Sequence, residues 1–219
     1  TDNVFKAWAT TSNGSGTWYM PGEEYEVESD VTFYAIWEEY TLVNTYTSLV
    51  NAVNLRNSYI KLTDNITHAI YNEDAIYQHR LIFDENRKTV LDLNGYTLNV
   101  TNYNEYMANE ISWISVYEQH ELTIKNGSLI YSNENVNTDQ SSYGAILVSG
   151  NATLITEDVN IRNKKNGSAV RAHDNATVIL DGGEIYTLSG WAVFTMHTST
   201  LILDGDVQLH IENSSNASS

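Results

Sequence analysis

LITEDVNI at residues 154–161 and VILDGGEI at residues 178–185 are two copies of the short pattern that decides the fold of this chain. Similar segments begin at Leu91 (LDLNGYTL), Leu122 (LTIKNGSL) and Leu201 (LILDGDVQL), and a weaker copy (IKLTDNI) begins at Ile60. The strong copies have apolar residues at offsets 0 and 7 (8 in the last), and Asn, Asp or Gly cluster at offsets 3 to 5. Successive copies start 23 to 32 residues apart, so the chain contains an internal repeat.

A second series of short apolar segments has the same period. Its equivalent positions, each eight or nine residues before the next copy, are Ile82, Ile114, Ile146, Val170 and Val193. The period is too short for propeller blades of about 40 residues or helix pairs of about 34, and the leucine-rich repeat pattern is absent. The sequence therefore predicts an all-β fold, a right-handed parallel β-helix of about six coils in which equivalent apolar residues form ladders.

A short helix is expected before the first repeat, in the segment TSLVNAVNL at residues 47–55. Thr47 or Ser48 would be its N-cap, and Leu49, Ala52 and Val53 would share its apolar face. A helix at this place would cover the open end of the stacked strands.

The helix segment SLVNAV and the repeats that follow it resemble pectate-lyase-like β-helix proteins over residues 42–213. The resemblance implies the fold but leaves the activity open, because that superfamily includes lyases, hydrolases, phage tailspikes and adhesins. We assign residues 41–213 to this domain and residues 214–219 to a flexible tail.

The first 40 residues differ from the rest. They contain eight acidic residues and one base, Lys6, and read as short strands at residues 5–8 and 31–37 separated by turns. We expect their three tryptophans to pack in a small core; a sugar-stacking platform is the alternative.

This segment resembles the Listeria–Bacteroides repeat, the internalin B-type, β-grasp-like module of bacterial surface proteins. The matching residues are FKAW at 5–8, Gly14, Gly16, Tyr25 and DVTFYAIW at 30–37. Ala7 stands where the family usually has glycine, and the family's first strands would precede Phe5, so residues 1–40 correspond to a partial module.

Composition excludes several classes of function. The chain has no Cys, which excludes a disulfide framework, a thiolate zinc site and a cysteine nucleophile. Its formal charge of −17 argues against nucleic acid or an anionic membrane as partner. No apolar run approaches the ~18 residues that span a bilayer, and no signal pattern begins the sequence. We therefore expect no membrane insertion. The chain is either intracellular or a fragment of a larger protein, and the resemblance to modules of bacterial surface proteins implies a fragment of a secreted bacterial cell-surface protein.

All candidates for catalysis in this sequence are weak, and the carboxylates are the best of them. Asp181 and Asp204 share offset 3 of the repeat, with Glu157 in the same ladder, and Arg171 is a nearby base. Calcium could bridge such carboxylates, but Asp, Asn and Gly at these offsets are also what a tight corner requires. We predict no cofactor and no metal site, and favour a non-enzymatic protein.

The loops at residues 101–111 and 132–142 enlarge the early repeats, and loops commonly carry binding residues. The candidate ligand-binding residues there are Tyr103, Asn104, Tyr106, Asn135 and Asp139. The favoured hypothesis is an adhesin-like segment whose partner is a host or environmental glycan or a protein surface. The alternatives are a carbohydrate-active enzyme (polysaccharide lyase or glycoside hydrolase) and a structural spacer.

Overall fold

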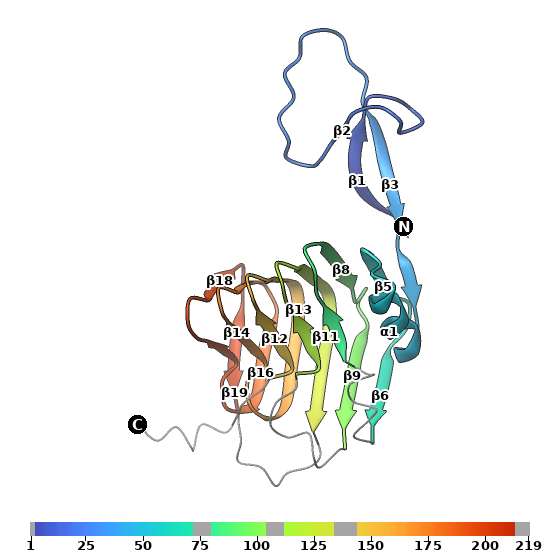
Figure 1. Cartoon of the computed structure of the whole chain (residues 1–219). Helices are drawn as coiled ribbons and strands as arrows, with labels where there is room; N and C mark the ends of the chain where they lie inside the picture. The colour runs from blue at the N-terminus through green and yellow to red at the C-terminus, as the bar shows by residue number, and fades with distance from the viewer. Residues whose placement is uncertain (1–2, 72–79, 104–111, 134–143, 213–219) are drawn as a thin grey trace. The chain divides into compact units, whose positions relative to one another are not determined.

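The computed structural model describes residues 3–71, 80–103, 112–133 and 144–212 (Figure 1). Contacts within the chain divide it into two units, Thr1–Thr41 and Leu42–Ser219. The boundary that we predicted at residue 40 lies one residue from this division. The predicted tail at residues 214–219 lies outside the described residues.

The first unit is a three-stranded antiparallel sheet with the order β2-β1-β3. Its strands are β1 (Asn3–Ala9), β2 (Trp18–Tyr19) and β3 (Tyr34–Glu39). The second predicted strand therefore begins three residues later than expected.

The tryptophans of the first unit do not form its core, so our packing prediction is wrong. Trp8, Trp18 and Trp37 are 44%, 42% and 59% exposed, whereas Ala7 and Ala9 are fully buried. The turn at residues 10–17 packs close to the alanine face, since a Cβ added at Gly14 would lie 3.2 Å from Cδ1 of Ile36, the strand partner of Ala7. Such close packing suits small side chains and leaves the large indole rings at the surface.

The second unit is all-β with parallel sheets, as predicted, and its one helix in the described residues is α1. A five-stranded sheet has the order β17-β14-β12-β10-β7. Its strands are β7 (Leu81–Phe83), β10 (Ile114–Val116), β12 (Ile146–Ser149), β14 (Val170–His173) and β17 (Val193–Thr195).

A larger sheet has the order β18-β15-β13-β11-β8-β5-β4, and a second row of strands pairs with the distal halves of β11 and β13. The main row contains β4 (Thr41–Val43), β5 (Tyr59–Leu62), β8 (Lys88–Asp92), β11 (Glu121–Asn133), β13 (Thr153–Asn166), β15 (Thr177–Asp181) and β18 (Thr200–Asp204). The second row adds β6 (Ile66–Ile70), β9 (Thr97–Asn102), β16 (Glu184–Ser189) and β19 (Gln208–Ile211).

The ladder predicted from the first series is largely confirmed. Leu122, Leu154, Val178 and Leu201 lie in register on four adjacent strands. Leu91 is an exception, because it pairs with Ile124 and not with Leu122.

The shift comes from a longer corner between β8 and β9. Four residues separate Asp92 from Thr97, whereas two separate their partners Lys125 and Ser128. Asn94 and Gly95 have positive φ angles of 54° and 83° and form this wider turn. Beyond the turn the register agrees with the sequence alignment again.

The second series is correct except at its first member. Ile114, Ile146, Val170 and Val193 are in register, but Ile114 pairs with Leu81 and not with the predicted Ile82. Leu81 and Phe83 are buried and Ile82 is exposed. Because side chains alternate along a strand, an error of one residue exchanges the buried and the exposed face.

Helix α1 (Tyr46–Asn54) packs on β6 and β7 beside the first strands of the second unit (Figure 1). The predicted apolar face of Leu49, Ala52 and Val53 is buried, as expected. The N-cap is Thr45 and not Thr47 or Ser48, because Thr45 and Ser48 form a reciprocal capping box.

The core of the second unit is the set of inward-facing apolar ladders. At the far end of the stack, the equivalent residues Leu203, Leu209 and Ile211 are exposed. Within the described part of the chain, no strand follows β18 and β19 in the sheet order to cover them.

Candidate functional site

Two tyrosines form an exposed aromatic platform where β6 and β9 end. Ile70 and Asn102 are in register, and the Tyr103 amide continues the ladder by donating to the Ile70 carbonyl at 2.8 Å. Tyr71 and Tyr103 therefore emerge side by side. Their rings stack with centroids 4.9 Å apart and an interplanar angle of 8°. The side chains are 68% and 42% exposed.

Tyr103 was a predicted ligand-binding residue, and Tyr71 was missed. A signal for Tyr71 was present in the sequence, because ITHAIY at residues 66–71 and LNVTNY at residues 98–103 both place tyrosine five positions after the first apolar residue of the strand. Flat rings with a phenol group suit partners that have one apolar and one polar side, which includes sugars.

The other predicted ligand-binding residues lie outside the described residues. Asn104 and Tyr106 fall in residues 104–111, and Asn135 and Asp139 fall in residues 134–143.

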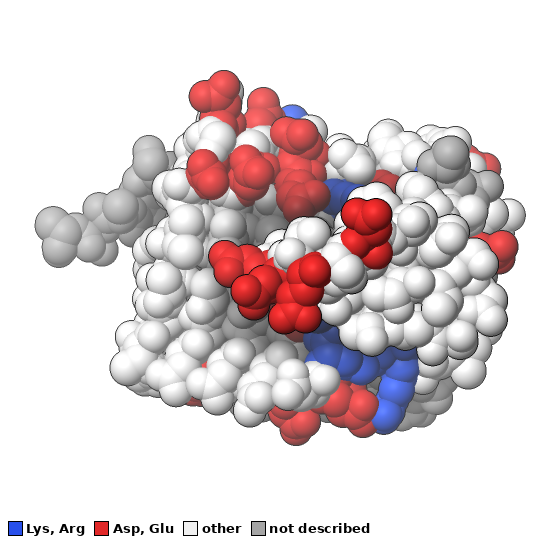
Figure 2. All heavy atoms as spheres, turned by 90° about the horizontal axis from the view of Figure 1, so that it is seen from above, with Lys and Arg blue, Asp and Glu red and all other residues white. Residues whose placement is uncertain are grey.

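The predicted carboxylate ladder is present in the larger sheet. Glu157, Asp181 and Asp204 are consecutive partners in register; Glu157 lies within β13, and Asp181 and Asp204 end β15 and β18. Asp and Glu outnumber Lys and Arg on the face of the molecule that Figure 2 shows. The same register continues through Lys125 and Asp92, so the ladder is not uniformly acidic.

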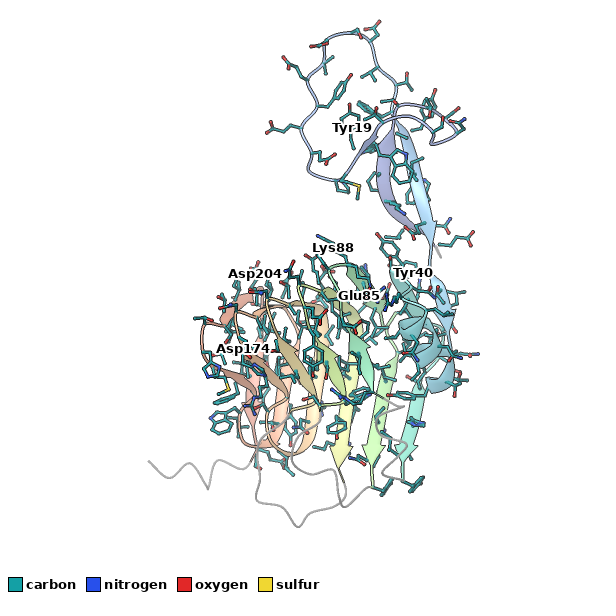
Figure 3. The ribbon with its side chains drawn as sticks, in the orientation of Figure 1. Tyr19, Tyr40, Glu85, Lys88, Asp174 and Asp204 are labelled. Atoms are coloured by element: carbon teal, nitrogen blue, oxygen red, sulfur yellow. The ribbon has the colours of Figure 1, made fainter. Side chains whose placement is uncertain are left out.

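Carboxylates at this position bond to the corners. Asp92 Oδ1 accepts hydrogen bonds from the Asn94 amide at 2.9 Å and from Asn126 Nδ2 at 3.2 Å. Asp204 (Figure 3) lies beside the positive-φ Gly205, whose amide donates to its Oδ1 at 2.9 Å. These contacts favour the interpretation of the acidic residues as corner residues.

Arg171 lies in the other sheet, on β14. Its guanidinium contacts the Met196 sulfur at 3.2 Å and lies 5.5 Å from the centre of the Phe194 ring. The chain turns at residues 174–176 before it reaches Asp181 at the end of β15. The structure thus places the candidate base and the candidate aspartates on different sheets.

His173 and His197 share one carboxylate, on the turn after β14 (Figure 3). Asp174 Oδ2 lies 2.6 Å from His173 Nδ1, and Asp174 Oδ1 lies 3.1 Å from His197 Nδ1. The bond with His173 is the main cause that lowers the pKa of the Asp174 carboxyl. Ser149 Oγ lies 3.2 Å from the same His173 Nδ1. A nucleophilic triad needs the serine and the carboxylate on opposite ring nitrogens, so this cluster is not one.

No group of three or more His, Cys, Asp or Glu side chains is arranged to hold a metal ion in the part of the chain that the structure describes. The prediction that no metal is bound, and the alternative of calcium on the acidic ladder, both remain predictions.

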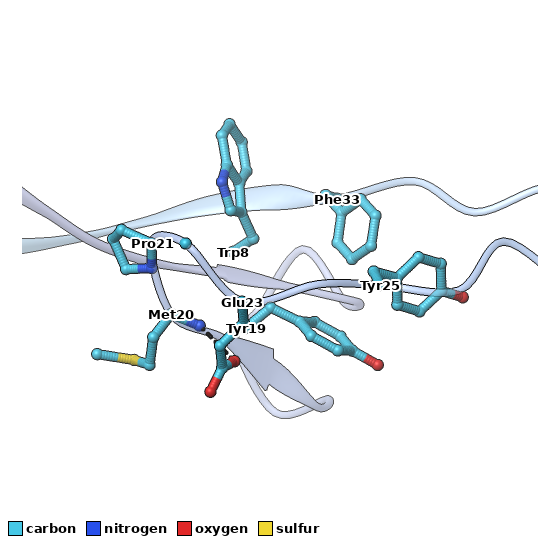
Figure 4. A pocket seen from close by; sticks show the side chains of 8 residues that line it. Trp8, Tyr19, Met20, Pro21, Glu23, Tyr25 and Phe33 are labelled. Atoms are coloured by element: carbon cyan, nitrogen blue, oxygen red, sulfur yellow. Dashed lines mark hydrogen bonds between the residues drawn. The ribbon is translucent and has the colours of Figure 1, made fainter.

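The first unit contains an aromatic pocket with a volume of about 310 Å³ (Figure 4). Trp37, Phe5 and Trp8 form a row on one face of its sheet, with centroids 5.8 and 5.0 Å apart, and Trp8 is the strand partner of Tyr19. The pocket is lined by Trp8, Tyr19, Met20, Pro21, Gly22, Glu23, Tyr25 and Phe33.

Comparisons with protein families, with curated proteins and with solved structures found no match. Among the described residues, no helix has the length and apolar character needed to cross a membrane.

Proposed function

We propose that the chain is a non-enzymatic, adhesin-like segment of a secreted bacterial cell-surface protein. In this proposal, residues 41–213 form a right-handed parallel β-helix of about six coils, and residues 1–40 are a partial Listeria–Bacteroides repeat. The parallel pairing of each repeat with the next supports the β-helix. The resemblances carried by SLVNAV, FKAW and DVTFYAIW support the cell-surface assignment.

The stacked pair Tyr71–Tyr103 is the observation that carries the binding function. Both residues directly follow strands that are held in register, so the backbone under the rings is ordered before any partner arrives. Preorganised aromatic side chains bind with a small entropic cost. The partner that fits this platform is a glycan, or a protein surface with exposed apolar groups.

A glycan array tests the proposal. We expect the full chain to bind one class of glycan without cleaving it, and to bind equally with calcium and with EDTA. Tyr71→Ala and Tyr103→Ala should each reduce the signal about tenfold. Tyr34→Ala, which removes a similarly exposed tyrosine from the first unit, is the matched control and should leave the signal unchanged.

Three results would contradict the proposal. Turnover of an acidic polysaccharide would favour the carbohydrate-active enzyme, with Asp181, Asp204 and Arg171 as its candidates. Binding that is unaffected by both tyrosine substitutions would show that the stacked tyrosines are not the binding site. A lack of binding on both glycan and protein arrays would favour the structural spacer.

A further inference from the structure

The aromatic pocket of the first unit has a rigid wall. Tyr19, Tyr25 and Phe33 contact one another edge to face, with ring centroids 5.1 to 5.6 Å apart and interplanar angles of 81° to 89°. Each ring therefore fixes the other two, in the geometry that aromatic pairs prefer. Trp8 lies apart from this trio and provides a second aromatic wall (Figure 4).

Glu23 is the one charged residue among those that line the pocket. Its Oε2 accepts a hydrogen bond from the Met20 amide at 2.7 Å, which holds the carboxylate at the pocket (Figure 4). The pocket thus combines several aromatic rings with one anchored negative charge.

The surroundings of the pocket are also acidic. The first unit carries eight Asp and Glu residues and one base, Lys6. That base forms an ion pair with Glu38 at 2.6 Å and lies over the Trp18 ring. Three further carboxylates, Glu24, Glu26 and Glu28, are exposed in the segment that follows Glu23. A negative field of this kind attracts cations and repels anions.

The polar groups of the pocket do not suit a sugar. Besides Glu23, the side-chain hydrogen-bonding groups in the lining are the hydroxyls of Tyr19 and Tyr25 and the single indole N–H of Trp8. Both Tyr19 and Tyr25 direct these hydroxyls away from Trp8 (Figure 4). A sugar ring held between the aromatic walls would leave several hydroxyl groups unpaired. An apolar neutral ligand would gain nothing from the carboxylate.

We propose that this pocket binds a quaternary ammonium group, with the methyl groups against Trp8 and the aromatic trio and the positive charge beside Glu23. Aromatic faces attract such cations, and desolvation in a pocket strengthens the attraction. A volume of about 310 Å³ suits a small ligand of this kind.

The test compares two ligands of the same shape. The full chain is titrated with choline and with 3,3-dimethylbutan-1-ol, in which carbon replaces the charged nitrogen, and binding is followed by calorimetry and by the indole NMR signals. We expect saturable binding of choline that is about tenfold tighter than that of the alcohol. Equal affinities, or no saturable choline binding, would overturn the proposal.

Two matched pairs of variants locate the site. Glu23→Gln keeps an acceptor for the Met20 amide but removes the charge, so choline binding should weaken about threefold while the alcohol is unaffected; Glu24→Gln should change neither. Trp8→Leu should abolish choline binding, and Trp37→Leu, outside the pocket, should not. If Glu24→Gln weakens binding as much as Glu23→Gln, or Trp37→Leu as much as Trp8→Leu, the ligand is not in this pocket. Failure here leaves the tyrosine platform of the second unit untouched.

Discussion

Replacing Thr156 with valine is expected to stabilise the second unit. Thr156 occupies an inward position on β13, in register between Ile124 on β11 and Leu180 on β15, and it is fully buried. Its Oγ1 has no hydrogen-bond partner among the described residues. The core therefore contains one polar atom in an otherwise apolar ladder.

The expected gain follows from the cost of that hydroxyl. A buried polar group without a partner costs about 1–3 kcal/mol, and valine has the same shape and stays β-branched, so packing and strand preference are retained. We expect the free energy of unfolding to rise by about 1–2 kcal/mol, part of the cost being already relieved by local relaxation.

Chemical denaturation measures this change. Urea titrations of the full chain, followed by circular dichroism, should give a higher midpoint for Thr156→Val with an unchanged m value. Thr89→Val is the matched control, because Thr89 is also buried but its Oγ1 lies 3.1 Å from His120 Nε2. That variant should lose about 1–2 kcal/mol. Destabilisation by Thr156→Val, or the same sign of change in both variants, would refute the reasoning.

Three further predictions concern the second unit. Burial lowers the pKa of His120 below its usual 6.5, so the unfolded chain binds more protons and stability should fall as the pH drops through 6.5; urea midpoints at pH 7.5 and 5.5 should differ less in His120→Gln. Gly183→Ala should cost more than 2 kcal/mol and Gly95→Ala only about 1, because both have positive φ but only Gly183 faces backbone within 4 Å; equal losses in urea would contradict this. Trp113 Nε1 donates to the buried Tyr46 hydroxyl at 2.7 Å, and a double-mutant cycle with Trp113→Phe and Tyr46→Phe should give a coupling of about 1 kcal/mol; a coupling near zero would assign the effect to packing alone.

The parallel ladders were predictable because the same physical constraint repeats along the chain. Leu154, Val178 and Leu201 occupy one inward position in three successive strands, and each is followed by a corner that needs residues tolerant of positive φ. Periodic burial and corner chemistry are both visible in residue types. The all-β class with parallel sheets and most of the register followed from these two patterns.

The error in register at Leu91 has a physical cause. Leu91 and Leu93 are both buried, and an apolar residue two positions along a strand fits the same face equally well. The alignment at offsets 0 and 7 therefore could not detect the two additional corner residues before Thr97. Only the hydrogen-bond partners across the sheet distinguish the two frames.

The aromatic residues illustrate a different limit. Their number in residues 1–40 was apparent, but burial of an indole ring depends on whether a second layer covers its face of the sheet, and no local pattern encodes that layer. The first unit covers the alanine face with its own turn and leaves Trp8 beside a pocket. Large exposed aromatic groups beside an anchored carboxylate contribute little to a minimal core. The free energy of burying their apolar surface can instead be gained when a ligand binds. The same argument applies to Tyr71 and Tyr103, whose stacked rings follow the last paired residues of their strands and pack on each other at the surface.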